Sequence, residues 1–301
     1  MLSVGQLAEF WERFFHGEVS AAPLVLFRIL AGCLLLLNGL LLVPLIDDYY
    51  SADGLWPSGC WKAQLRGRRF SLLHWLPCST WSFRWVLMLH LAACVMLILG
   101  WQFRFACWVV FLTLVSIHHR NVHILSSGDS LLRMLVFFCC FSDAAGGLSV
   151  DHWLAGRRQL EFATSDPWPL RLMQIQLSIV YLRTVYWKLK GSLWRDGTAA
   201  WYPLWVSAYV RFRPPRVLLR PQLIRLATWG TLLEETLLGA GLWIHELRLP
   251  LIVSGVVLHL VFDLILNLQL FSWIMIISLL LFLSPHEAEA VLGWLWRAGP
   301  G

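Results

Sequence analysis

Long apolar segments alternate with polar segments along most of the chain, and no segment shows the two-residue alternation of a half-buried strand. The first apolar run covers residues 23–46 and is interrupted only by Arg28 and Asn38. A helix needs about 20 mainly apolar residues to cross a bilayer, so this run predicts a membrane-spanning helix. Seven further runs follow, at residues 85–100, 105–117, 124–141, 170–189, 223–244, 249–267 and 270–283.

These runs predict an all-α fold, a polytopic integral membrane helical bundle with about eight transmembrane helices. Several runs are short, so some helices could be tilted, re-entrant or buried within the bundle. Before the first run, apolar side chains recur at spacings of three and four, at Val4, Leu7, Trp11, Phe14 and Phe15. We predict an amphipathic helix over residues 1–20 that lies in the membrane interface, although a cap packed on the bundle fits equally well. Residues 21–285 then form one membrane domain, and residues 286–301 form a short C-terminal tail.

Composition supports the membrane interpretation. The 301 residues are 58% hydrophobic and only 14% charged, whereas soluble domains carry about 25% charged residues. An ordinary soluble enzyme, a disordered chain and a nucleic-acid-binding domain are therefore excluded. The net charge is +6, but the basic residues lie between the apolar runs rather than along one stripe. We expect a multi-pass protein of the plasma membrane that contacts membrane lipid and does not bind nucleic acid.

The polar connections leave the orientation in the membrane open. With eight spans, residues 47–84 and 190–222 share one side and carry the basic residues Lys62, Arg66, Arg68, Arg69, Arg211, Arg213, Arg216 and Arg220. The positive-inside rule places that side in the cytoplasm, whereas the family resemblance given below implies the opposite. Cys60 and Cys78 share one connection and could form a disulfide in an oxidising compartment. No spacing of Cys and His residues predicts a metal site.

Lys188 ends the fifth run and is one of only three lysines, against twenty-one arginines. A desolvated lysine can lose its proton and act as a base, which an arginine cannot do. The alternative is a lysine at a helix end whose amine reaches the polar interface. Spacing alone favours this second interpretation.

Two further groups of polar residues are candidates because ionisable groups in membrane segments are costly. His118, His119, Arg120, Asn121 and His123 follow the third run as a turn, with Asp129 shortly after. They could shuttle protons or orient a substrate, or they could hold a short loop in place.

His259, Asp263 and Asn267 recur every four residues, which predicts one polar face on the seventh helix. The face could orient an imidazole, join helices or line an ion path. Glu234 and Glu235 are adjacent in the sixth run. At least one of them should face inward and pair with Arg133, Arg183 or Lys188.

Several segments resemble the HTTM family, the horizontally transferred transmembrane domain shared with vitamin K-dependent gamma-carboxylases. Residues 176–197, QLSIVYLRTVYWKLKGSLWRDG, are similar to the family stretch YxxxGxxKLxGxxWxxG. Residues 121–129 are similar to a family loop that ends in GGD, here Ser127-Gly128-Asp129. Residues 141–151 and 267–272 are similar to the carboxylase stretches FMDAN…WSVD and NSQLFS. The matches keep their order from about residue 20 to residue 285.

The resemblance implies a chemistry. In the carboxylase a membrane-embedded lysine deprotonates a reduced lipid quinone, vitamin K, and oxygen then converts the quinol to an epoxide. The strong base formed on the way removes a γ-proton from a glutamate side chain, and carbon dioxide adds to the carbanion. Lys188 matches that lysine by its place in the motif, and His123 matches the histidine associated with the addition of carbon dioxide. A reduced lipid quinone, O2 and CO2 are thus the implied cofactor and co-substrates, with no metal.

The match is incomplete, and other functions stay open. The family's Ala-Gly pair before the lysine motif is Thr184-Val185 here, and Trp187-Lys188 replaces two consecutive lysines. Short family members resemble a membrane component that matures a secreted sporulation-delaying toxin. The first hypothesis is therefore a quinol-dependent oxidase, epoxidase or carboxylase-like enzyme. The alternatives are an accessory factor for a secreted peptide or protein client, and a proton-coupled transporter that uses the His259 face.

Overall fold

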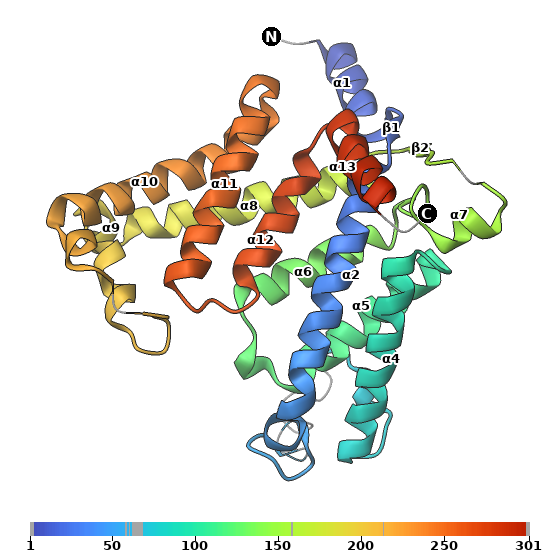
Figure 1. Ribbon diagram of the computed structural model, residues 1–301, viewed down its shortest axis with the longest axis horizontal. Coiled ribbons are helices and arrows are strands. Elements are labelled where there is room, and N and C mark those ends of the chain that lie inside the picture. The colour runs from blue at the N-terminus through green and yellow to red at the C-terminus, as the bar shows by residue number, and fades with distance from the viewer. Residues whose placement is uncertain are drawn as a thin grey trace. The chain divides into compact units, whose positions relative to one another are not determined.

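The computed structural model describes residues 3–57, 59, 61, 69–157, 159–212 and 214–298 (Figure 1). Most of these residues are helical, and the one sheet among them pairs β1 (Val19–Ser20) with β2 (Thr164–Ser165) in antiparallel fashion. The prediction of an all-α fold is confirmed. The chain divides into two compact units, which we call the first unit (Met1–Arg171 with Ser284–Gly301) and the second unit (Leu172–Leu283). Cys60, Lys62, Arg66, Arg68 and Arg213 lie outside the described residues.

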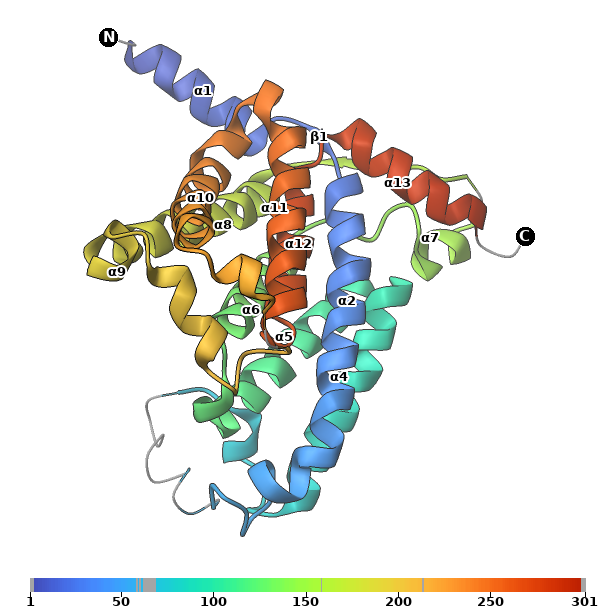
Figure 2. The same cartoon turned by 60° about the vertical axis from the view of Figure 1, so that its left-hand side comes forward.

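The first unit is built around α2 (Ala22–Leu42), which continues through η1 (Val43–Leu45) and a π-helical turn, η2 (Ile46–Tyr50). The helix α4 (Thr80–Leu99) packs against α2 and against α5 (Phe103–Arg120), as Figures 1 and 2 show. The remaining elements of this unit are α1 (Val4–His16), η3 (Leu72–His74), η4 (Val122–Ile124), α6 (Ser127–Cys139), α7 (Val150–Leu154) and α13 (Pro285–Ala298). The helix α6 packs on α5, and α13 packs on α2.

Local chemistry sets the ends of these helices. The Ser79 hydroxyl accepts a hydrogen bond from the backbone of Ser82 and begins α4. Gly100 ends α4 with φ +63°, and a Cβ there would overlap the side chain of Arg28. Arg28 itself is fully buried in α2 and donates to the carbonyl oxygens of Leu97 and Ile98 at 3.1 and 3.3 Å. The last carbonyls of α4 are therefore satisfied by a side chain of another helix.

The second unit contains most of α8 (Trp168–Lys190), the helix that enters it from the first unit. Its other elements are α9 (Ser192–Arg195), η5 (Ala199–Trp205), η6 (Arg216–Leu219), α10 (Pro221–Ala240), η7 (Gly241–Trp243), α11 (His245–Ile265), α12 (Phe271–Leu279) and η8 (Leu280–Phe282). The helix α11 packs against both α10 and α12. A close approach at Gly239 brings α10 against α8, because a Cβ there would lie 2.7 Å from Leu182 and 3.3 Å from Tyr181.

Within the part of the chain that the structure describes, three helical segments are long and apolar enough to cross a membrane: Ala22–Tyr50, Thr80–Leu99 and His245–Ile265. A fourth follows if Phe271–Phe282 and Pro285–Arg297 are counted together as one broken span. Large apolar side chains cover the outer faces of these segments; Val253, Val257 and Leu264 of α11 are 56%, 53% and 64% exposed. Such faces are stable in hydrocarbon and not in water, so the protein is a multi-pass integral membrane protein.

Each apolar run of the sequence contains a helix, but several boundaries differ from the prediction. His118, His119 and Arg120 form the last turn of α5 rather than a loop, because the helix continues to Arg120. The segment predicted as a C-terminal tail contains the helix α13, which a Ser284–Glu287 capping pair begins. The N-terminal amphipathic helix forms as α1, where Phe10 and Trp11 remain 64% and 61% exposed.

Candidate functional site

The predicted base Lys188 forms an ion pair in the second unit. Its Nζ atom lies 2.5 Å from Oε1 of Glu235, which projects from α10. The side chains are only 18% and 9% exposed, so the pair is mostly shielded from surrounding solvent or lipid. The Nζ atom of Lys188 also lies over the ring of Trp194 in α9, 4.5 Å from the ring centroid. A basic partner was predicted for at least one of Glu234 and Glu235, and the structure pairs Glu235 with Lys188.

A second polar contact joins α8 to α11. The Tyr181 hydroxyl and Nε2 of His259 are 2.9 Å apart, and both residues are buried. The charge of Lys188 acts on His259, and the charges of Glu235 and Glu234 act on Tyr181, so the four ionisable groups and the phenol form one cluster. We call Tyr181, Lys188, Glu234, Glu235 and His259 the polar cluster.

The sequence places these residues together through helix periodicity and one glycine. Tyr181 and Lys188 are seven residues apart in α8, hence on one face of the helix. Gly239 lets α10 approach that face closely, which puts the carboxyl of Glu235 within reach of the lysine. Tyr181 and Trp194 lie within the motif of residues 176–197 and were not predicted as site residues. Their spacing from Lys188 was the available signal for their contact with the cluster.

The polar cluster contains buried atoms that lack a hydrogen-bond partner within the described structure. These are Oε1 of Glu234, Oε2 of Glu235 and Nδ1 of His259. Buried polar groups normally have partners, so these three atoms are the cluster's candidates for contact with a polar ligand or a water molecule. A hydroxyl-bearing ring, such as that of a reduced lipid quinone, would offer donors to the two carboxyl oxygens.

Chemically, the Lys188–Glu235 pair can hold one proton at two positions. When the carboxyl carries the proton, the amine is neutral and can accept another from a bound hydroxyl. The 2.5 Å distance between Nζ of Lys188 and Oε1 of Glu235 is therefore short enough for direct proton transfer between them.

The polar face predicted on α11 is only partly formed. Asp263 pairs with Arg211 at 3.2 Å, and Arg211 also donates to the backbone oxygen of Asp263. The helix ends at Ile265, because Leu266 is extended and forms a bridge with Val210. Asn267 therefore lies beyond the helix, where its N–H donates to the Tyr209 carbonyl, and the expectation of a three-residue face is wrong. An ion path along α11 is therefore less well supported, because Asn267 is not on the helix and Asp263 is paired with Arg211.

The second group of predicted residues lies in the first unit. Asn121 is 3% exposed and follows α5; its amide donates to the Tyr49 carbonyl at 3.3 Å, and its carbonyl accepts from the backbone N–H of His123. Asp129 caps α6 through the backbone and hydroxyl of Ser126, at 2.7 and 2.8 Å. Asn121 and Asp129 thus hold local backbone structure.

His123 itself is exposed and lies in η4, with its ring edge against Trp56 at a centroid distance of 4.7 Å. Its side chain is available to a ligand. Lys188 belongs to the second unit and His123 to the first.

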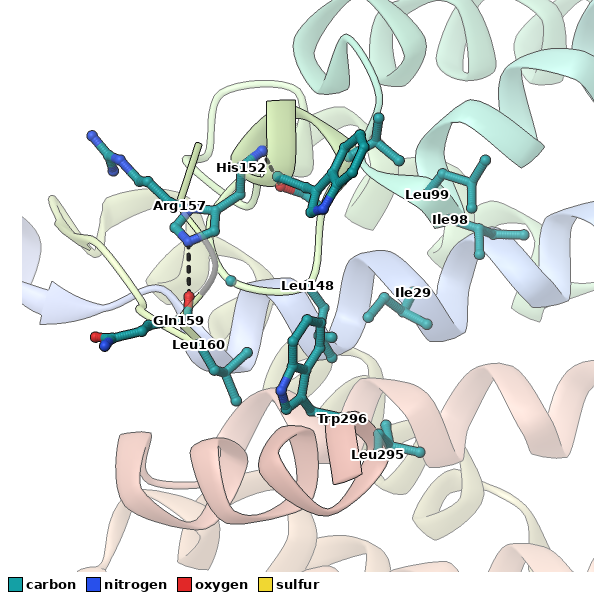
Figure 3. A pocket seen from close by; sticks show the side chains of 14 residues that line it. Ile29, Ile98, Leu99, Leu148, His152, Arg157, Gln159, Leu160, Leu295 and Trp296 are labelled. Carbon is teal, nitrogen blue, oxygen red and sulfur yellow. Dashed lines mark hydrogen bonds between the residues drawn. The ribbon is translucent and has the colours of Figure 1, made fainter. Parts of the chain in front are cut away.

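The first unit also contains an apolar cavity of about 470 Å³ (Figure 3). Leu295 and Trp296 of α13 line one side of it, and Ile98 and Leu99 at the end of α4 line another. His152 is fixed at the wall through a hydrogen bond of 3.1 Å between its Nε2 atom and the Gln159 carbonyl. The predicted site residues do not line this cavity, and its chemistry suits hydrocarbon.

Comparisons place the chain among known proteins. No solved structure matches it. It is 27% identical to the uncharacterized protein YitO of Bacillus subtilis (strain 168) over 228 residues, which cover 71% of each chain. It is 24% identical to the sporulation-delaying protein SdpB of the same organism over 208 residues, which cover 66% of this chain and 64% of SdpB. The HTTM domain matches residues 16–286, and the chain therefore belongs to the HTTM family.

Proposed function

We propose that the protein is a membrane-embedded enzyme that removes a proton from a lipid quinol, with Lys188 as the base. The observation that carries the proposal is the buried ion pair of Lys188 and Glu235, 2.5 Å apart, within a cluster of further ionisable groups. Charges in a membrane protein are costly, and a cluster of them inside one unit is typical of proton handling. The resemblance of the surrounding motif to the carboxylases supports the same role.

Each residue has a defined part in this proposal. Lys188 accepts the hydroxyl proton, and Glu235 positions the amine and takes its proton when the base is regenerated. Tyr181 holds the ring of His259, whose Nδ1 atom stays available to a ligand. His123, in the first unit, is the candidate for assisting a carbon dioxide addition. A reduced lipid quinone would supply the acidic hydroxyl and two electrons for oxygen.

The test is turnover by the purified protein in air with a reduced lipid quinone. We expect oxygen uptake and a quinone epoxide by mass spectrometry, with one epoxide and one water formed per O2. Lys188→Arg keeps the positive charge beside Glu235 but cannot release its proton, so we expect loss of turnover in a folded protein. Lys190→Arg changes the neighbouring exposed lysine of the same helix and should keep full activity. Full turnover in Lys188→Arg would disprove the role of Lys188.

A second function is supported by the similarity to SdpB, a sporulation-delaying protein. In this proposal the protein is an accessory factor for the production of a secreted peptide, and the polar cluster holds α8, α10 and α11 together. Co-expression with a candidate peptide would then yield mature secreted peptide in both the wild type and Lys188→Arg. Equal secretion by both, with no quinol turnover, would favour this function over the enzyme.

We also infer that the shorter or more polar helices α5, α6, α8 and α10 lie within the bilayer, which keeps the total near eight spans. Their apolar runs support the inference, as does the exposure of Phe105 in α5 and Leu233 in α10, at 63% and 62%. Single cysteines placed at these two positions should resist a membrane-impermeant maleimide. Rapid labelling of both would reduce the number of spans.

A further inference from the structure

The first unit contains a cavity of about 580 Å³ that is lined mainly by polar side chains, none of which belongs to the polar cluster. Its wall is formed by Arg69, His119, Val122, Leu125, Ser126, Ser127, Ser130 and Arg133. Ser127, Ser130 and Arg133 recur every three residues in α6, so they share one side of that helix. Two arginines and several hydroxyl donors therefore face one space at the beginning of a helix.

The positive charge in this cavity lacks compensation from the residues around it. Neither Arg69 nor Arg133 forms an ion pair with any residue that the structure describes. The charge of Arg69 acts on Arg133 more strongly than that of Asp129, the nearby carboxylate. Asp129 is also engaged as the cap of α6 through Ser126. Arg133 is only partly exposed, and an unpaired guanidinium in that position is costly without an anion.

His119 fixes the position of Arg133. Nδ1 of His119 donates to the Phe70 carbonyl at 2.5 Å, which leaves Nε2 as an acceptor for the Arg133 guanidinium at 3.4 Å. With Nε2 accepting from Arg133, the ring orients the guanidinium.

We propose that this cavity binds a phosphate group through Arg69, Arg133, Ser127 and Ser130. Two guanidinium groups and two hydroxyls offer more donors than the two oxygens of a carboxylate can accept, whereas a phosphate offers three or four. The positive end of the α6 dipole adds to the attraction. The phosphate can belong to an anionic phospholipid headgroup, since basic residues near a membrane surface attract such lipids, or it can be free phosphate.

The test measures binding of two probes to the full-length protein in detergent micelles. The first probe is inorganic phosphate, measured by isothermal titration calorimetry. The second is phosphatidic acid, measured by native mass spectrometry against diacylglycerol with the same acyl chains and no phosphate. Arg69→Gln and Arg133→Gln should each weaken binding by roughly tenfold or more, because a charge-assisted contact is lost. Arg195→Gln, at an exposed arginine of α9, is the charge-matched control.

The outcomes separate the sources and can overturn the proposal. Binding of inorganic phosphate that the two site variants lose supports a free-phosphate site. Binding of phosphatidic acid alone, over diacylglycerol, supports a headgroup site. If Arg133→Gln fails to fold, the exposed Arg69→Gln variant still decides the result. Binding of neither probe, equal binding of diacylglycerol, or an equal loss in Arg195→Gln would overturn the proposal. Quinol turnover is not part of this readout.

Discussion

The ion pair of Lys188 and Glu235 makes a quantitative prediction about stability. Removing one partner of a buried pair leaves the other charge uncompensated, at a cost of about 3–5 kcal/mol. Lys188 keeps 18% of its side-chain surface and also contacts Trp194, so Glu235→Leu should cost about 3 kcal/mol, the lower end of this range. Lys188→Met leaves a carboxyl that is 9% exposed but can take up a proton, and its cost should be about the same.

The double variant, Lys188→Met with Glu235→Leu, removes both charges and fills the space with apolar atoms. Its stability should lie within about 1.5 kcal/mol of the wild type, because apolar replacement of a whole buried pair is often neutral. The two single effects are then non-additive by about 4 kcal/mol or more. Reversible unfolding in mixed micelles of a mild detergent and SDS measures all three differences.

A matched control lies next to the pair. Glu234 has a buried carboxyl oxygen without a partner among the described residues, so Glu234→Gln should change the stability by less than about 1 kcal/mol. Additive single effects, or a cost for Glu234→Gln as large as that for Glu235→Leu, would refute the reasoning that the 2.5 Å contact organises this unit.

Two further predictions concern packing and a helix cap. Gly239→Ala places a Cβ 2.7 Å from Leu182 and should destabilise the protein by about 1–3 kcal/mol in the same unfolding assay. Gly230→Ala in the same helix meets open space and should be neutral or stabilising. Ser126→Ala removes the cap of α6 and should cost about 1 kcal/mol by thermal unfolding, with no effect if the cap is absent in solution.

The apolar runs predicted the helices because burial in hydrocarbon is a property of each segment by itself. The Lys188–Glu235 pair was also within reach of sequence reasoning, since an intramembrane acid needs a cation and the chain offers few. The contact of Tyr181 with His259 was not, because it depends on how α8 packs against α11 in three dimensions. The pattern of apolar residues along either helix does not tell which buried residue of the other helix a phenol will meet.

Element ends were predicted less well, for a similar reason. Asn267 was assigned to a helix by its four-residue spacing from Asp263, but the chain leaves the helix to pair Leu266 with Val210. His118 to Arg120 were assigned to a loop because polar residues follow an apolar run, yet Arg120 donates to the carbonyls of Tyr50 and Ser51 and extends the helix. In both cases a partner more than 50 residues away decides the end.

The contact of Arg28 with the end of α4 has a consequence for biosynthesis. The carbonyl oxygens that Arg28 serves lie 69 and 70 residues later in the chain, so α2 leaves the ribosome well before its partners exist. Until α4 has been made, α2 carries the charged side chain of Arg28 without its hydrogen-bond partners there. A charge of this kind raises the free energy of inserting the helix into the bilayer by up to about 3 kcal/mol. We therefore expect α2 to settle fully in the bilayer once α4 has been made and its last carbonyls can pair with Arg28.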